Sequence, residues 1–153
     1  MLSLRRLFSV LMALGVICGL SVVQAKPSSC DRRVYLTFDT GHMGVADLVA
    51  QVLQRQQVRA TFFAADEPTQ TGDGSLGTHW AAWWRARAAE GHVLASHTLD
   101  HLYWRRDLPN ERFEVRATSG PFKGQTRVMD AAQYCAEIKR GSERLQQIRS
   151  EEH

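Results

Sequence analysis

The sequence lacks any large excess of charge of one sign. It has 19 lysines and arginines against 16 aspartates and glutamates, and the basic residues are interspersed with acids rather than gathered in a stripe. A nucleic-acid-binding protein usually carries such a basic stripe. No nucleic-acid partner is therefore expected, and the sequence contains no internal repeat or low-complexity tract.

Cysteine is also scarce, with three in 153 residues. Too few are present for the dense disulfide framework of small secreted domains, so the fold must rest on a hydrophobic core of ordinary size. Export would allow a disulfide between Cys30 and Cys135. Equally, both cysteines could be unpaired, with Cys135 simply packed on a helix.

The first residues are typical of a targeting segment. Arg5 and Arg6 precede an almost wholly apolar run over residues 7–23, and Val23-Gln24-Ala25 has small residues at the two positions that a signal peptidase inspects. We expect a signal peptide over residues 1–25 and an exported protein, periplasmic or extracellular, with no stable membrane span after cleavage. A retained anchor is the alternative, although the run is near the lower length limit for a span. Cleavage removes two arginines, which leaves 17 basic against 16 acidic residues.

After a polar lead-in at residues 26–33, one domain is expected over residues 34–153. Apolar runs predict strands at 34–38, 58–64 and 93–96. Helices are predicted from Val45 to about Gln57 and from Trp80 to Glu90, the second capped by Thr78, with a loop at 66–77 between them. Strands that alternate with helices favour parallel βαβ units, whose chemistry lies at the carboxyl ends of the strands.

The last third is less regular. Phe113 and Val115 alternate with charged residues before a strong turn at 119–121, which fits a surface hairpin or long loop over residues 105–129. Asp130 then caps a helix from Ala131 to about Arg149. Its apolar face is expected to consist of Tyr134, Ile138, Leu145 and Ile148, with Gly141 on the same stripe. That glycine either permits a close contact or only weakens the helix.

Three residues suggest a catalytic site. Asp39 ends the first predicted strand, and His97 follows the third, with His101 four residues later. On a helix this spacing puts both imidazoles on one face, within reach of one metal ion. Imidazole nitrogen suits zinc or a similar divalent metal. A His-x-x-x-His pair alone is weakly specific, but the position of these residues at strand ends favours a metal site.

Asp39 has three possible roles. It can be a general base that takes a proton from a metal-bound water, or it can itself ligate the metal and complete a set of two histidines and one carboxylate. The structural alternative is a helix-capping aspartate after a strand.

Three segments carry a family resemblance. The segment Thr37-Phe38-Asp39-Thr40-Gly41 resembles the first motif, Thr-Phe-Asp-Asp-Gly, of the NodB-type polysaccharide deacetylases, carbohydrate esterase family 4. Residues 60–63, Ala-Thr-Phe-Phe, resemble the strand that follows that family's first helix. Residues 90–101 resemble its second motif, His-Ser/Thr-x-x-His, with the usual preceding residues. Order and spacing agree over residues 34–101.

The resemblance implies an α/β fold, the deformed (β/α) barrel of the NodB homology domain, and metal-dependent removal of N- or O-acetyl groups from a glycan of the peptidoglycan or chito-oligosaccharide class. By resemblance, Asp39 is the catalytic base, and His97 and His101 are metal ligands. The metal, zinc first, would polarise the acetyl carbonyl and bind water, and Asp39 would deprotonate that water.

The ligand set departs from the family pattern at Thr40. The family's metal-binding aspartate falls there, and a threonine hydroxyl is a poor zinc ligand. A catalytic zinc normally keeps three protein ligands. The third could be Asp39, His42 or Thr40 itself, or the site has lost its metal; we rank a surviving two-histidine site above loss.

The chain also ends before the family's later motifs. An arginine–proline strand, an Asp-Trp segment and a Leu-x-His that supplies the general acid are all absent after Met129. We therefore expect an incomplete barrel of about three βα units that lacks its C-terminal strands: a fragment, a truncated product or a fold completed by another chain. An unclosed sheet leaves a free edge and uncovered apolar surface.

Aromatic residues admit a sugar-binding interpretation. Tyr103 and Trp104 follow His101 and could line a cleft. Trp80 and Trp84 are expected to face the sheet, and Trp83 to be the more exposed tryptophan. Four arginines could meet an anionic glycan, although a solvated loop is the simpler interpretation: Arg105, Arg106, Arg112 and Arg116. The alternative function is a catalytically dead glycan-binding module with the same fold.

Overall fold

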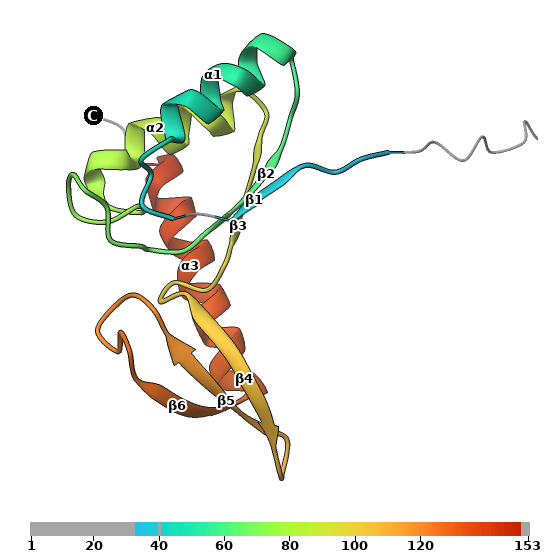
Figure 1. The fold of residues 1–153 in the computed structure, drawn as a ribbon, viewed down its shortest axis with the longest axis vertical. Coiled ribbons are helices and arrows are strands. Elements are labelled where there is room, and N and C mark those ends of the chain that lie inside the picture. The colour runs from blue at the N-terminus through green and yellow to red at the C-terminus, as the bar shows by residue number, and fades with distance from the viewer. Residues whose placement is uncertain (1–32, 40, 151–153) are drawn as a thin grey trace, which may run out of the picture. The chain divides into compact units, whose positions relative to one another are not determined.

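The computed structural model describes residues 33–39 and 41–150, so the expected signal peptide, Cys30 and Thr40 lie outside the described residues. The chain divides into residues 1–33 and 34–153. In the second part, the described residues form three helices and two separate three-stranded sheets (Figure 1). None of these helices combines the length and the apolar character needed to cross a membrane.

The first sheet is parallel, as the alternation of apolar and amphipathic segments predicts. Its order is β1 (Thr37–Asp39), β2 (Thr61–Ala64) and β3 (Val93–Ser96), with α1 (Ala46–Gln56) and α2 (Thr78–Ala89) as the crossover helices. The register aligns Phe38 with Phe62 and Phe62 with Leu94. Because all three strands run in one direction, their carboxyl ends lie at a common edge.

The first predicted strand is too long by three residues. Val34 and Tyr35 are 93% and 80% exposed, and regular pairing begins only at Thr37. The reason is position: β1 pairs with β2 on one side and has no partner on the other among the described residues. An edge strand loses half of its ladder hydrogen bonds, so apolar composition alone did not make residues 34–36 a buried strand.

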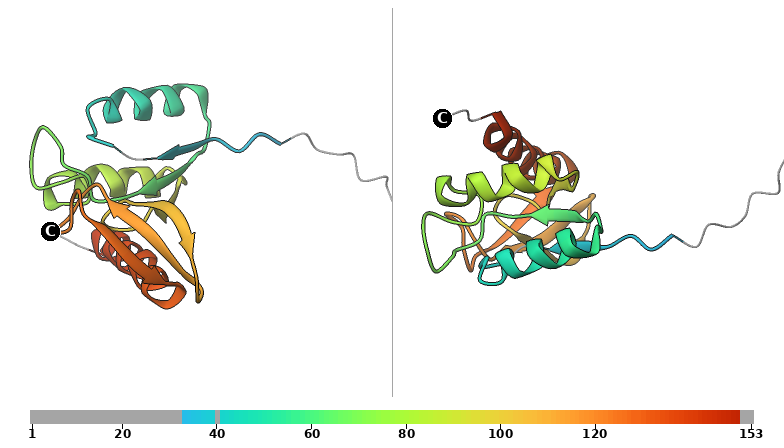
Figure 2. Two further views of the ribbon diagram at one scale, coloured as in Figure 1. Left: turned by 60° about the horizontal axis from the view of Figure 1, so that its bottom comes forward. Right: turned by 90° about the horizontal axis from the view of Figure 1, so that it is seen from above.

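The main core lies between the parallel sheet and its helices. Phe62 is at its centre, with its ring 5.3 Å from that of Phe38 in a stacked arrangement and 6.0 Å from that of Trp84 in an edge contact. Leu145 and Ile148 of α3 (Ala131–Ser150) complete this core. The two other views show α1, α2 and α3 around the parallel strands (Figure 2).

Residues 102–130 form a second sheet rather than a simple hairpin or a long loop. It is an antiparallel meander of β4 (Leu102–Leu108), β5 (Arg112–Ala117) and β6 (Thr126–Asp130). Phe113 and Val115 point into a small core of their own, as their alternation with charges predicts. The described residues thus form no closed barrel, although their mixed α/β composition agrees with part of the expected fold.

Helix α3 is capped as predicted. The Asp130 carboxylate accepts a hydrogen bond from Gln133 N at 2.8 Å, and Gln133 Oε1 accepts one from Asp130 N at 3.0 Å, which is a capping box. One expected core residue is wrong, since Ile138 is 39% exposed and Glu137 is buried instead. Figure 1 shows α3 running from the antiparallel sheet to the parallel one, and both cores draw on its residues.

Helix α2 is capped by a residue that the sequence analysis did not select. Thr78 is its first residue and not its cap. The Asp73 carboxylate accepts hydrogen bonds from the backbone N–H groups of Thr78 and His79 and from the Thr78 hydroxyl. The acid therefore satisfies the free amides at the start of the helix from within the preceding loop.

Candidate active site

Asp39 and His97 meet at the carboxyl edge of the parallel sheet. Asp39 is the last residue of β1, and His97 directly follows β3, on the far side of β2. The distance between Asp39 Oδ2 and His97 Nε2 is 3.4 Å. Two segments almost sixty residues apart are therefore joined by an acid–imidazole contact, as strand ends at a common edge predict.

The segment from His97 to His101 is a tight turn, so the helical geometry that would pair residues four apart does not apply to it. Thr98 and His101 both have left-handed backbone angles, with φ of 64° and 48°. The Thr98 hydroxyl accepts a hydrogen bond from Leu102 N at 2.8 Å and closes the turn. The two imidazole centroids still lie 4.9 Å apart in an edge contact, so the turn achieves the juxtaposition by another route.

This turn is attached to α3 through a buried acid. Asp100 is only 2% exposed, and its Oδ2 lies 3.5 Å from Arg140 Nη1. Gly141, the next residue of the helix, packs against Ser96 and the backbone of Leu99. The position of both histidines therefore depends on a helix that begins thirty residues later in the chain.

Glu67 is a site residue that the sequence analysis missed. Its Oε1 contacts Nδ1 of His101, and both side chains are largely buried. Glu67 lies three residues beyond the end of β2. In a parallel sheet, residues at or just beyond the carboxyl ends of the strands are the ones that form a site. Glu67 is placed in this way at β2, as Asp39 and His97 are at β1 and β3, so the sequence pattern also indicates the Glu67 loop.

Burial disfavours the charged form of the second histidine, His101. The pKa of His101 is lowered from its usual value chiefly by burial, and the negative charge of Asp39 opposes this shift only in part. Burial likewise raises the pKa of Asp66, the neighbour of Glu67, against the hydrogen bond from Leu76 N. Burial thus favours the neutral form of His101, in which an imidazole nitrogen can act as a ligand or acceptor.

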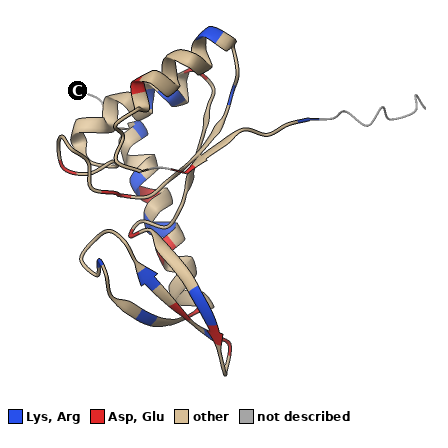
Figure 3. Ribbon diagram, viewed as in Figure 1, with Lys and Arg blue, Asp and Glu red and all other residues tan. Residues whose placement is uncertain are grey.

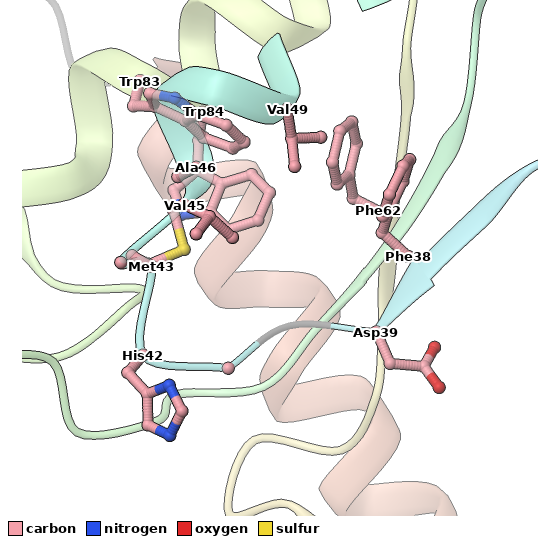
Figure 4. A pocket seen from close by; sticks show the side chains of 12 residues that line it. Phe38, Asp39, His42, Met43, Val45, Ala46, Val49, Phe62, Trp83 and Trp84 are labelled. Carbon is pink, nitrogen blue, oxygen red and sulfur yellow. The ribbon is translucent and has the colours of Figure 1, made fainter. Parts of the chain in front are cut away.

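An apolar pocket of about 240 Å³ adjoins the site on the α1 side of β1. Phe38, Phe62, Met43 and Val49 are among the residues that line it (Figure 4). His42 is exposed, and its ring and the Asp39 carboxylate point in different directions in the close-up. In this arrangement the described contacts unite Asp39 with His97 and His101, while His42 stands apart from them.

The sequence model of the polysaccharide deacetylase family matches residues 26–152, which is most of the chain. The chain belongs to the polysaccharide deacetylase family. That family is NodB-type and acts on acetylated polysaccharides, so the family resemblance is borne out. No solved structure matches the chain.

In this polysaccharide deacetylase, the side chains at the site are of the chemical types that bind a divalent metal. Two imidazoles stand edge to face, and carboxylates adjoin each of them: Asp39 at His97 and Glu67 at His101. Imidazole with carboxylate is a ligand chemistry that zinc accepts. Over residues 33–39 and 41–150, however, no group of three or more His, Cys, Asp or Glu side chains is already arranged to hold an ion.

Only one of the two candidate sugar-binding aromatics stands free beside the site. Tyr103 is 49% exposed, and its ring centroid lies 4.8 Å from that of His101. Trp104 is similarly exposed, but its ring stacks on Phe113 at 3.7 Å and meets Tyr134 edge-on. Tyr103 can therefore extend a substrate surface from His101, whereas Trp104 covers the second core.

The other tryptophans are core residues. Trp84 is fully buried and Trp80 is partly buried against the main core, as expected. Trp83 is not the exposed one: it packs edge-on against Phe62 and Trp84, with the Arg87 guanidinium 4.9 Å from its ring centroid. The expectation for Trp83 is wrong because α2 packs broadly enough on the sheet to bury this ring as well as those of Trp80 and Trp84.

The arginines of the antiparallel sheet form no single-sign surface. Arg106 pairs with Glu114 at 2.9 Å across the strands. Blue and red segments are mixed along the helices and strands (Figure 3). This agrees with the solvated-surface interpretation of these residues.

Proposed function

We propose that this polysaccharide deacetylase is a metal-dependent hydrolase that removes acetyl groups from an N- or O-acetylated polysaccharide of the peptidoglycan or chito-oligosaccharide class. The observation that carries the proposal is the contact of the Asp39 carboxylate with His97, beside the ring of His101. A base, two imidazoles and an exposed edge are the parts that hydrolysis of an amide or ester needs.

Asp39 is the base in this proposal. Its side chain is 67% exposed, so water and substrate can reach it. The carboxylate would accept a proton from the attacking water. The neighbouring imidazole of His97 would hold the carboxylate in its orientation. A divalent metal, zinc first, would be held by His97 and His101 and would polarise the acetyl carbonyl. Asp39, which contacts His97, offers a carboxylate for a third ligand.

The test is hydrolysis of an acetylated chito-oligosaccharide, with the rate measured as the release of acetate. Asp39→Asn preserves the shape of the side chain and removes the base, so the rate should fall by about 10²–10⁴-fold. Asp47→Asn, at an exposed acid in the first turn of α1, is the matched control and should leave the rate unchanged. Equal rates for Asp39→Asn and the parent protein would overturn the assignment of the base.

A glycan-binding module without catalysis is the second candidate, and the exposed ring of Tyr103 beside His101 favours it. Here metal-loaded protein would release no acetate yet bind the oligosaccharide in a calorimetric titration. Release of acetate at a rate that depends on Asp39 would remove this candidate.

We also propose that the protein is exported. The support is the basic and apolar pattern of residues 1–25. N-terminal sequencing of protein from the periplasm or medium should begin at Lys26; full-length protein retained in the cytoplasm would contradict export.

A further inference from the structure

The contact between Glu67 and His101 joins two loops at the edge of the parallel sheet. Oε1 of Glu67 meets Nδ1 of His101, and the side chains are 15% and 13% exposed. An ionised carboxylate can only accept hydrogen bonds. When Glu67 is ionised and the imidazole is neutral, the nitrogen that faces Glu67 carries the proton and the opposite nitrogen, Nε2, keeps its lone pair.

Glu67 is held in place through its backbone by Ser75, which is fully buried. Glu67 N donates to Ser75 Oγ at 2.9 Å, and Ser75 N donates to Glu67 O at 2.8 Å. The Ser75 hydroxyl in turn donates to Ala65 O at 2.6 Å, and Trp84 Nε1 donates to Ser75 O at the same distance. The loop that carries the carboxylate is thus fixed by Ser75 and, through Ser75, by the buried Trp84 of α2.

His101 is also fixed through its backbone, by Thr118, the residue that follows β5. Its carbonyl oxygen accepts hydrogen bonds from both the backbone N–H and the hydroxyl of Thr118, each at 3.2 Å. Its φ of 48° is a left-handed conformation that surrounding structure must impose on a non-glycine residue. Two independently anchored backbones therefore bring the carboxylate and the imidazole together.

We propose that Glu67 is a positioning residue for His101: it accepts the hydrogen bond from Nδ1–H, fixes that tautomer and ring orientation, and leaves Nε2 free to bind a divalent metal. The metal part rests on the proposed function. Metal-ligating histidines commonly use their second nitrogen in this way. In a chain with Thr40 where its family has an acid, Glu67 supplies a negative charge next to the second imidazole.

The first experiment reads the tautomer in metal-free protein. Nitrogen-15 NMR of the imidazoles at pH 7.5 distinguishes Nδ1–H from Nε2–H without any substrate. His101 should show Nδ1–H in the parent protein, and Glu67→Ala should abolish this preference. Glu143→Ala, at an exposed glutamate of α3 that pairs with Lys139, is the matched control and should leave His101 unchanged. An Nε2–H signal in the parent, or an unaltered Nδ1–H signal in Glu67→Ala, would overturn the inference.

The second experiment measures zinc binding by calorimetric titration. Loss of such an outer carboxylate should weaken binding by about 10–100-fold in Glu67→Ala, with Glu143→Ala equal to the parent. Unchanged zinc affinity in a folded Glu67→Ala protein, checked by its thermal melt, would count against the inference. If the parent binds no zinc, the metal part of the proposed function fails, while the tautomer comparison still decides whether Glu67 positions His101.

Discussion

Gly141 of α3 lies directly against Ser96, the last residue of β3. A Cβ placed on Gly141 would lie 3.2 Å from Ser96 Cβ and 3.4 Å from Leu99 N, and closer still to Ser96 Oγ. That hydroxyl accepts a hydrogen bond from Thr98 N at 3.2 Å, within the turn that carries His97 and His101. The missing side chain of the helix is therefore what allows the turn to form against it.

Gly141→Ala should destabilise the protein. Overpacking typically costs about 1–3 kcal/mol, against which alanine gains about 1 kcal/mol of helix propensity over glycine. Urea denaturation should show a lower free energy of unfolding, and a smaller loss in a Ser96→Ala background, because the hydroxyl is the nearest atom. A more stable Gly141→Ala protein would mean that the glycine only weakens the helix.

Asp73 should make the stability depend on pH in acid. Hydrogen bonds from the backbone of Thr78 and His79 and from the Thr78 hydroxyl lower its pKa from 3.8 to about 2. The unfolded chain takes up this proton at higher pH, so the contribution is complete above about pH 4 and is lost as the pH falls toward 2. Asp73→Asn should have a shallower decline of unfolding free energy across this range; an identical decline would refute the assignment.

Trp84→Phe should loosen the loop that carries Glu67. The substitution keeps a buried ring but removes the donor to Ser75 O, and an unpaired buried acceptor costs about 1–3 kcal/mol. Hydrogen exchange measured by mass spectrometry should increase over residues 66–77 more than over the antiparallel sheet. Faster exchange spread evenly over the whole protein would point to general loss of packing instead.

Tyr103→Ala should weaken glycan binding without loss of stability. The ring is exposed and adjoins His101, whereas the ring of Trp104 stacks on Phe113. Titration with a chito-oligosaccharide should give a several-fold higher Kd for Tyr103→Ala and an unchanged Tm. Tyr35→Ala, at another exposed tyrosine, is the control. Equal Kd values for the two variants would remove Tyr103 from the substrate surface.

The parallel part of the fold could be predicted because its signals are local. Strand β3 was predicted to the residue, and both crossover helices to within a few residues, from short apolar runs and helical periodicity. The antiparallel sheet could not be predicted, because β4 exposes nearly all of its residues and is defined by pairing with β5. Such pairing depends on partners distant in sequence, which no local pattern contains.

The family, the parallel βαβ order and the strand ends that bear Asp39 and His97 follow from the sequence alone, because periodicity and motif spacing are written along the chain. The folded arrangement was needed to establish that the histidine segment is a turn braced by α3, that Trp83 is packed, and that Glu67 meets His101. These outcomes depend on which surfaces approach one another. A buried contact between two loops exists only once each has been fixed by its own hydrogen bonds.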